Sequence, residues 1–180
     1  AATYSTLKVT TDAGASWTSI KAGLPNYNIT DVTVSYNDTD HIWVTFSEYS
    51  ANHKGYESVD RGASWNNITG NNLPNLPVNC IVFQDMSKEE LYIGTDIGVY
   101  YKDNTMSDWA PFMNGLPNVI VRELEIHYGE GTISAATYGR GVWKRPLNSL
   151  PTNINEIQNS ISIFPNPSNN HITISYPKHS

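Results

Sequence analysis

Two aspartates, Asp12 and Asp60, occupy the same place in two nearly identical octapeptides and are the first candidates for chemistry in this sequence. The segments Thr10 to Trp17 and Ser58 to Trp65 share the pattern Ser/Thr-x-Asp-x-Gly-Ala-Ser-Trp. An aspartate could act as a catalytic acid or base, or as a calcium ligand. However, no calcium loop of the Asp-x-Asp/Asn-x-Asp/Asn-Gly type is present. The two aspartates also belong to separate repeats, so nothing places them together as a carboxylate pair.

The octapeptide has a structural explanation instead. An aspartate at a hairpin turn accepts hydrogen bonds from the backbone N–H groups just after it. Gly14 and Gly62 permit a positive φ that a side chain would penalise. Trp17 and Trp65 start the next strand and are expected to bury a large ring between neighbouring repeats. We therefore interpret both octapeptides as turns.

The elements that must position these turns also repeat along the chain. A worn third copy of the octapeptide runs from Asp103 to Trp109 and lacks the glycine. Each Trp is followed after seven or eight residues by a Leu-Pro dipeptide, and each dipeptide is followed by an alternating strand. Successive markers lie 43 to 49 residues apart. Periods in the forties with about four strands each are typical of propeller blades.

The sequence therefore predicts an all-β fold, a partial β-propeller of about three to four four-stranded antiparallel blades in an open arc. No segment has a sustained 3.6-residue apolar period, so helices should be few. The Asn- and Asp-rich residues 37–40 should form the tight turn between the first two strands of a complete blade. The predicted blades are residues 5–20 (two strands), 29–69, 78–112 and 119–146 (about three strands).

Three regions are predicted along the chain. Residues 1–147 form the partial propeller. Residues 148–160 are polar and contain Pro and Asn, which is typical of a linker. Residues 161–180 contain two alternating strands around a Pro-Asn-Pro turn, which predicts a short β-hairpin.

The octapeptide resembles the Asp-box, or BNR repeat, of sialidases, sortilin-like receptors and xyloglucanase-type glycoside hydrolases. The resemblance implies that the box is structural and lies on the turn between the third and fourth strands of a blade. It also implies that ligands bind at the opposite end, where the loops between second and third strands lie.

These loops carry Tyr and Arg side chains suited to sugar stacking and carboxylate contact. The ligand-face candidates are Glu48, Tyr49, His53, Asp96, Tyr138 and Arg140. The alternative interpretation is that these residues are ordinary loop side chains that contact only solvent. His53 in particular is expected to be exposed.

The catalytic chemistry of the resembled families cannot be assembled from this chain. A sialidase needs an arginine cluster and a Tyr nucleophile, and one of the four arginines, Arg61, lies inside a box turn. The catalytic carboxylates of xyloglucanases have no match here either. Common phosphate-cradle, zinc-protease and serine-hydrolase motifs are absent. We therefore expect no catalytic, cofactor-binding or metal-binding residue and no cofactor in this segment.

The residues Phe164, Pro165, Asn166 and Pro167 resemble the opening of the type A C-terminal sorting domain of the Bacteroidetes type IX secretion system. The resemblance implies that the parent protein is secreted or displayed on the cell surface, with the outer-membrane secretion machinery as a partner. The later strands and terminal basic motif of such a domain are not found, so the domain is expected to be truncated.

Composition limits the other partners. The formal net charge of −6 argues against nucleic acid or an anionic membrane as the main partner. No apolar stretch is long enough for a transmembrane helix. The single cysteine, Cys80, is expected to be a buried small hydrophobe.

The favoured function is a non-catalytic propeller segment of a secreted or cell-surface protein, either a scaffold or a binder of a glycan or protein ligand. The alternative is the C-terminal part of a secreted glycoside hydrolase whose catalytic residues lie in missing blades.

Overall fold

The computed structural model describes residues 1–85 and 88–148, together with the backbone of two short strands at 162–164 and 173–175. The chain divides into two units, Ala1–Asn148 and Ser149–Ser180. The first unit consists of antiparallel sheets with a single short 3-10 turn, η1 (Tyr128–Glu130). None of the described residues forms a helix long and apolar enough to cross a membrane.

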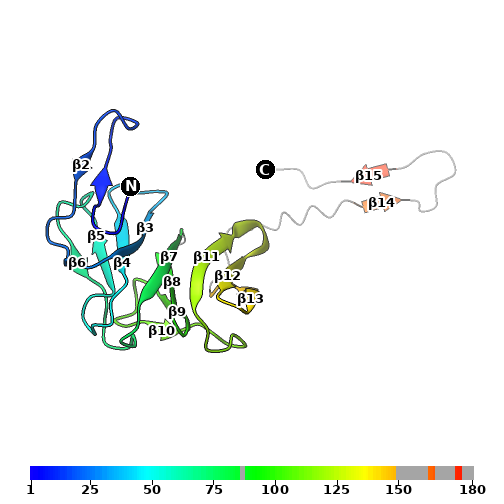
Figure 1. Cartoon of the computed structure of the whole chain (residues 1–180). Helices are drawn as coiled ribbons and strands as arrows, with labels where there is room; N and C mark the ends of the chain where they lie inside the picture. The colour runs from blue at the N-terminus through cyan, green and yellow to red at the C-terminus, as the bar shows by residue number, and fades with distance from the viewer. Residues whose placement is uncertain (86–87, 149–161, 165–172, 176–180) are drawn as a thin grey trace. The chain divides into compact units, whose positions relative to one another are not determined.

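The first unit is built from four successive antiparallel sheets, here called blades 1 to 4 (Figure 1). Within each blade, every strand pairs with the next one in sequence, as in an up-and-down propeller blade. The predicted all-β, partial-propeller fold is confirmed. Blade 1 contains β1 (Lys8–Val9) and β2 (Thr18–Ser19). Blade 2 contains β3 (Ile29–Val34), β4 (Ile42–Phe46), β5 (Gly55–Ser58) and β6 (Asn66–Asn67). Blade 3 contains β7 (Val78–Gln84), β8 (Glu90–Thr95), β9 (Gly98–Lys102) and β10 (Ala110–Pro111). Blade 4 contains β11 (Val121–His127), β12 (Thr132–Thr137) and β13 (Gly141–Pro146).

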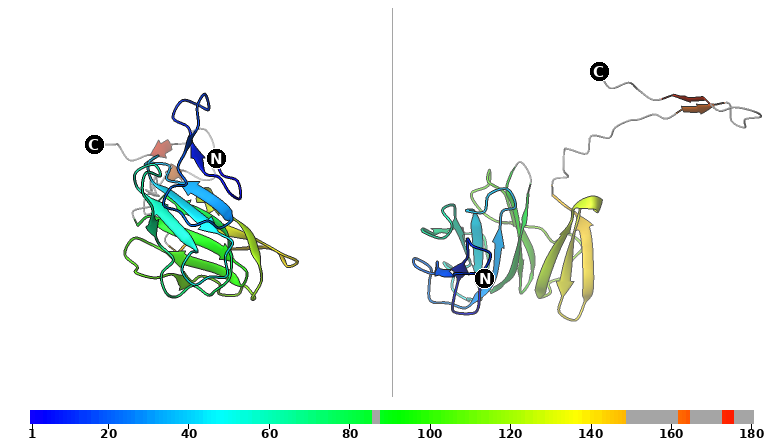
Figure 2. Two further views of the ribbon diagram at one scale, coloured as in Figure 1. Left: turned by 60° about the vertical axis from the view of Figure 1, so that its left-hand side comes forward. Right: turned by 90° about the horizontal axis from the view of Figure 1, so that it is seen from above.

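The blades pack on one another through their faces. Strand β7 contacts both β3 and β11, so the first strands of blades 2, 3 and 4 lie side by side (Figure 2). Apolar clusters fill the spaces between successive blades. Strand β8 is buried along its whole length because blades cover both of its faces. Burial of successive residues along a strand is expected where both sides of a sheet are covered.

The two ends of the blades carry different loops. Arg61, in the β5–β6 turn, donates from its Nε to Asp40 Oδ1 in the β3–β4 turn at 2.7 Å. The Ser47 N–H, at the start of the β4–β5 loop, donates to Asn28 O in the loop between blades at 2.9 Å. The box turns therefore share one end, which we call the box end, with the turns between first and second strands. The loops between second and third strands lie at the other end, which we call the loop end.

Both box turns have the same hydrogen bonds. Asp60 accepts from the Ser64 N–H at 2.8 Å and from the Ser64 hydroxyl at 2.6 Å. The Ser58 hydroxyl accepts from the Gly62 N–H at 2.7 Å. In the first box, Asp12 binds the Ser16 N–H and hydroxyl in the same way. The box side chains thus close their own turns.

The Asp60 carboxyl is expected to titrate at about pH 2 rather than at its ordinary pKa of 3.8. The Ser64 hydroxyl, the Ser64 N–H and the Ser58 hydroxyl all donate to the charged form, which lowers the pKa. A lowered folded-state pKa favours folding above the ordinary value, and this contribution is lost as the pH falls through about 2. NMR titration of the carboxyl carbon would measure it. In Ser64→Ala the pKa should rise, and an unchanged value would contradict this explanation.

Trp17 departs from the expected burial. It is 47% exposed, whereas Trp109 of the worn box is 2% exposed. The Trp109 indole donates to Ile68 O of blade 2 at 2.8 Å, and Trp65 donates to Ile20 O of blade 1 at 2.9 Å. Trp17 is exposed because, among the described residues, no sheet precedes blade 1.

In the second unit, β14 (Ser162–Phe164) pairs antiparallel with β15 (Thr173–Ser175). The predicted hairpin therefore has its two strands. Pro165, Asn166 and Pro167 of the sorting motif lie outside the described residues, as do residues 149–160 of the predicted linker.

Candidate functional site

A groove of about 680 Å³ lies between blades 2 and 3 at the box end. This volume falls within the range of typical ligand pockets, which is about 300–1,000 Å³. Its walls include side chains of β4, β5 and β6 from blade 2 and the β9–β10 turn from blade 3. Polar and apolar groups both line it. We call it the inter-blade groove.

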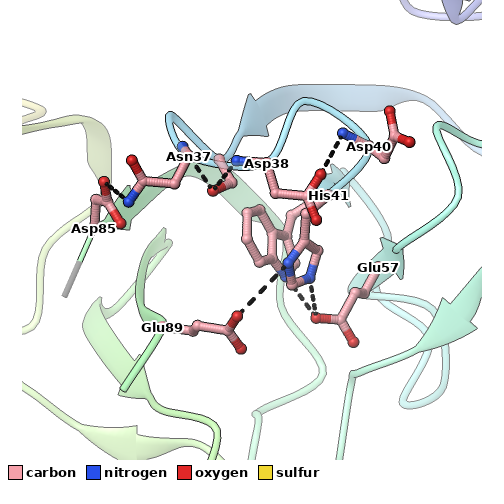
Figure 3. A network of polar contacts seen from close by, with 9 residues as sticks. Asn37, Asp38, Asp40, His41, Glu57, Asp85 and Glu89 are labelled. Carbon is pink, nitrogen blue, oxygen red and sulfur yellow. Dashed lines mark hydrogen bonds and ion pairs between the residues drawn. The ribbon is translucent and has the colours of Figure 1, made fainter. Parts of the chain in front are cut away.

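His41 lines this groove and contacts the carboxylates of Glu57 and Glu89 (Figure 3). Its Nε2 lies 2.7 Å from Glu57 Oε1, and its ring stacks on Trp43 with centroids 3.9 Å apart. The Trp43 indole N–H donates to the same Glu57 oxygen at 3.0 Å. Because an ionised carboxylate only accepts hydrogen bonds, Nε2 carries a proton in this arrangement.

The strand register brings these side chains together. Trp43 on β4 is the direct cross-strand partner of Glu57 on β5, and His41 immediately precedes β4. Trp43 also stacks on Phe83 of blade 3, with ring centroids 4.6 Å apart. The floor of the groove is therefore an aromatic stack that continues from one blade into the next.

Blade 3 contributes a second carboxylate. Glu89 Oε1, from the turn between β7 and β8, lies 3.9 Å from His41 Nδ1. Glu89 adopts a φ of 50°, which is uncommon for a residue with a side chain. Beside it, Asn37 of blade 2 donates to Asp85 of blade 3 at 2.5 Å. His41 thus lies between carboxylates of two blades (Figure 3).

The far wall of the groove is the worn box of blade 3. Asp103 accepts from the Thr105 N–H at 2.9 Å and from the Tyr101 hydroxyl at 2.9 Å. Burial raises the pKa of Tyr101, and the hydrogen bond to Asp103 raises it further, so the hydroxyl stays protonated as a donor. This turn is one residue longer than the other two boxes and has no glycine.

The groove has an excess of negative charge. Its lining contains four carboxylates, from Asp38, Glu57, Glu89 and Asp103, against one lysine, Lys102, and His41. Within the described parts of the chain, no group of three His, Cys, Asp or Glu side chains is placed to hold a metal ion. The excess of carboxylates can form hydrogen bonds and attract a positively charged group.

The predicted ligand-face residues lie in the loops at the loop end. Tyr49 and Tyr138 are strongly exposed. Asp96 accepts from Asn79 at 2.9 Å. Glu48 accepts from the N–H groups of Tyr49 and Ser50 and so caps its own loop. Arg140 is exposed, and its backbone carbonyl accepts from the Trp143 indole. The structure does not bring the six candidates into one cluster of contacts among the described residues.

His53 differs from the expectation of an exposed side chain. It is half-buried, and its Nδ1 lies 2.6 Å from the Tyr56 hydroxyl. Its ring also lies 5.5 Å from that of Tyr27, which belongs to the loop between blades 1 and 2. The neighbouring Lys54 is buried, with its ammonium donating to the Glu48 carbonyl. Desolvation by burial lowers the pKa of Lys54.

The sequence analysis did not identify His41, Glu57 and Glu89. None belongs to a motif, and only strand register and blade packing bring them together. One further signal was overlooked. Ala-Ala-Thr-Tyr occurs identically at residues 1–4 and 135–138, and both tyrosines, Tyr4 and Tyr138, are strongly exposed.

Comparison with known proteins identifies a fold. No protein-family profile matches the chain, and no curated protein sequence matches it. Among solved structures, Ycf48 bound to a D1 peptide is similar with a TM-score of 0.59 and 17% identity, over 83% of this chain and 47% of that one. An ancestral GH74 enzyme has a TM-score of 0.56 and 16% identity, over 74% of this chain and 19% of that one. A GH74 enzyme of Niastella koreensis has a TM-score of 0.51 and 19% identity, over 77% of this chain and 26% of that one. The chain thus spans less than half the length of these structures, and its fold is that of a partial β-propeller like those of Ycf48 and the GH74 enzymes.

Proposed function

We propose that this chain is a non-catalytic, ligand-binding segment of a propeller protein, and that its inter-blade groove receives a basic side chain of a protein ligand. The observation that carries the proposal is the ligand-sized groove, which is lined by four carboxylates and by the buried His41. Glu57 is held by both His41 and Trp43, and Glu89 lies beside His41, which suits binding better than proton transfer.

The charge of the groove favours a protein ligand over a neutral glycan. A lysine or arginine side chain entering it would meet the Glu89 carboxylate, which is half-exposed beside the nearly buried His41. Complementary charges of this kind increase the association rate and specificity more than they increase affinity. Ycf48, a propeller of similar fold, is solved with a bound peptide, which agrees with this choice.

The Glu89→Gln variant is expected to bind a Lys/Arg-rich peptide several-fold more weakly than the unchanged chain. Loss of one partly exposed ion pair costs up to about 1 kcal/mol, or roughly fivefold in affinity. Isothermal titration calorimetry against a library of basic peptides would measure it. Binding should also weaken with added salt, because exposed charges are screened.

Glu125→Gln is the matched control, because it removes the same charge from an exposed position in blade 4. It should bind like the unchanged chain. Equal weakening in both variants would indicate a general charge effect and contradict the groove. Tighter binding of xyloglucan oligosaccharides than of any basic peptide would contradict the choice of a protein ligand.

A second candidate function is that the chain is part of a secreted glycoside hydrolase, with catalytic carboxylates in other blades of a longer parent. Its support is the similarity in fold to GH74 enzymes, one of which is the xyloglucanase of Xanthomonas campestris. The test is release of reducing sugar by the full-length parent from a panel of polysaccharides. A parent that releases none would eliminate this candidate.

We also propose that the parent protein is exported across an outer membrane to the cell surface or beyond. The support is the Phe-Pro-Asn-Pro sequence at residues 164–167 after a polar segment. Fusion of the complete C-terminus of the parent to a reporter in a Bacteroidetes host tests it. A reporter that remains in the periplasm would refute the proposal.

A further inference from the structure

A tryptophan slot recurs between successive blades, and two copies of it are filled. Trp65 fills the copy between blades 1 and 2 and donates to Ile20 O, while Trp109 fills the copy between blades 2 and 3 and donates to Ile68 O. Each tryptophan immediately precedes the fourth strand of its blade. In each case the acceptor residue follows the fourth strand of the preceding blade. The two copies therefore define the same local structure.

Strand register shows which residues form this slot in each blade. Trp109 belongs to a buried cluster with residues from the first three strands of blade 3, Ile81, Ile93 and Tyr100. Ile93 pairs with both Ile81 and Tyr100 across the sheet. In blade 4, the same register positions are held by Leu124, Ala135 and Trp143.

The blade 4 residues in these positions line an apolar slot. The slot also includes Phe112, which follows β10 as Ile68 follows β6, and Leu116 of the third Leu-Pro dipeptide. Its volume of about 40 Å³ is too small for a typical small-molecule pocket. An indole can enter it only if the side chains that line it, Arg145 among them, move aside.

No tryptophan fills this third copy among the described residues. Trp143 is 39% exposed, whereas Tyr100 in the equivalent position under Trp109 is 6% exposed. The guanidinium of Arg145 lies 3.7 Å from the Phe112 ring and partly covers the slot. The apolar wall is thus formed, and the Arg145 side chain covers part of it.

The neighbouring strand edge is also unpaired. β13 pairs with β12 on one side, and no strand of the described chain pairs with its other side. It forms the outer edge of blade 4 (Figures 1 and 2). An open strand edge offers backbone N–H and C=O groups to an added strand.

We propose that the slot and the β13 edge together bind one extended peptide strand of box type, in which a tryptophan is followed three residues later by a large apolar residue. The filled copies specify this ligand, because Trp65 precedes Ile68 and Trp109 precedes Phe112 by that spacing. The strand runs antiparallel to β13, as β10 does to β9. Its indole enters the slot against Trp143 and donates to Phe112 O.

A synthetic peptide copying residues 58–69, titrated into the full chain, tests this interaction. We expect saturable binding of one peptide per chain, measured by isothermal titration calorimetry. A peptide with alanine at the tryptophan position should bind at least tenfold more weakly, since a buried tryptophan usually dominates such an interface. An equal affinity for both peptides would overturn the proposal.

Two variants of the chain localise the binding. Ala135→Phe places a ring inside the slot from β12 and should abolish binding. Ala136→Phe adds the same ring on the opposite face of the same strand, because neighbouring strand residues point to opposite faces, and should bind like the unchanged chain. Circular dichroism confirms that each variant is folded. If Ala135→Phe does not fold, the alanine peptide still decides the question.

Absence of peptide binding by the folded chain would overturn the proposal. Self-association of the chain that is lost in Trp17→Ala would mean that a second copy fills the slot with its own exposed tryptophan, and would overturn the choice of a separate strand. Loss of basic-peptide binding in Glu89→Gln leaves this inference unaffected, because the two sites lie between different pairs of blades.

Discussion

Replacing Trp109 with alanine is expected to lower the free energy of unfolding of the propeller unit by about 3–5 kcal/mol, the usual cost of deleting a large aromatic side chain from a core. Trp109 is almost fully buried in the cluster between blades 2 and 3. The substitution leaves a cavity there and removes the hydrogen bond from the indole to Ile68 O. Urea unfolding followed by circular dichroism would measure the loss.

Trp17→Ala is the matched control, because Trp17 has the same place in its own box. Its ring is about half exposed, and its indole makes no hydrogen bond within the described residues. We expect a loss below about 1 kcal/mol, as for most surface substitutions. Equal losses in the two variants would show that the box tryptophans stabilise their own turns rather than the contact between blades.

The sequence predicted the blades because their signals are local and periodic. The Asp-x-Gly turn at Asp60 and Gly62 depends on hydrogen bonds within a few residues. The same holds for the turn at residues 37–40, where Ser35 Oγ accepts from the N–H groups of Asn37 and Asp38. Such features form without information from distant residues, so spacing alone located the strands between them.

The groove could not be predicted, since its geometry arises between strands and between blades. His41 meets Glu57 only because β4 and β5 pair in one register, and it meets Glu89 only because blade 3 packs on blade 2. Each of these side chains alone looks like an ordinary charged residue of a strand end or turn. The exposure of Trp17 has the same origin, because it depends on a neighbouring blade rather than on the box itself.

The residues at the loop end were also only partly predictable from the sequence. Tyr49 and Tyr138 were placed in loops by the sequence, and both are exposed there. His53 lies in one of the same loops but packs against Tyr27 of another segment. The sequence therefore predicts that a residue lies in a loop. It does not predict which side chains that residue contacts, because these belong to other segments of the fold.

Gly62→Ala is expected to destabilise the propeller unit by about 2–4 kcal/mol, by two separable effects. Gly62 has a φ of +86°, a conformation that costs a residue with a side chain about 1 kcal/mol or more. A methyl group there would also lie 2.7 Å from Cβ and Cδ1 of Ile20 in the preceding blade. Overpacking of this kind typically costs about 1–3 kcal/mol. Thermal or urea unfolding of the variant would give the total.

Gly14→Ala separates the two effects, because Gly14 occupies the same place in the first box. Its φ is +93°, and nothing lies within 4 Å of the position that a methyl group would take. Gly14→Ala should therefore show the conformational cost alone, about 1 kcal/mol, and the difference between the two variants should measure the clash with Ile20. If both variants lost the same stability, the packing of the Gly62 turn against blade 1 would contribute nothing, and the glycine would serve the local turn alone. A larger loss at Gly62 would mean that the box turn also fixes how closely one blade approaches the next.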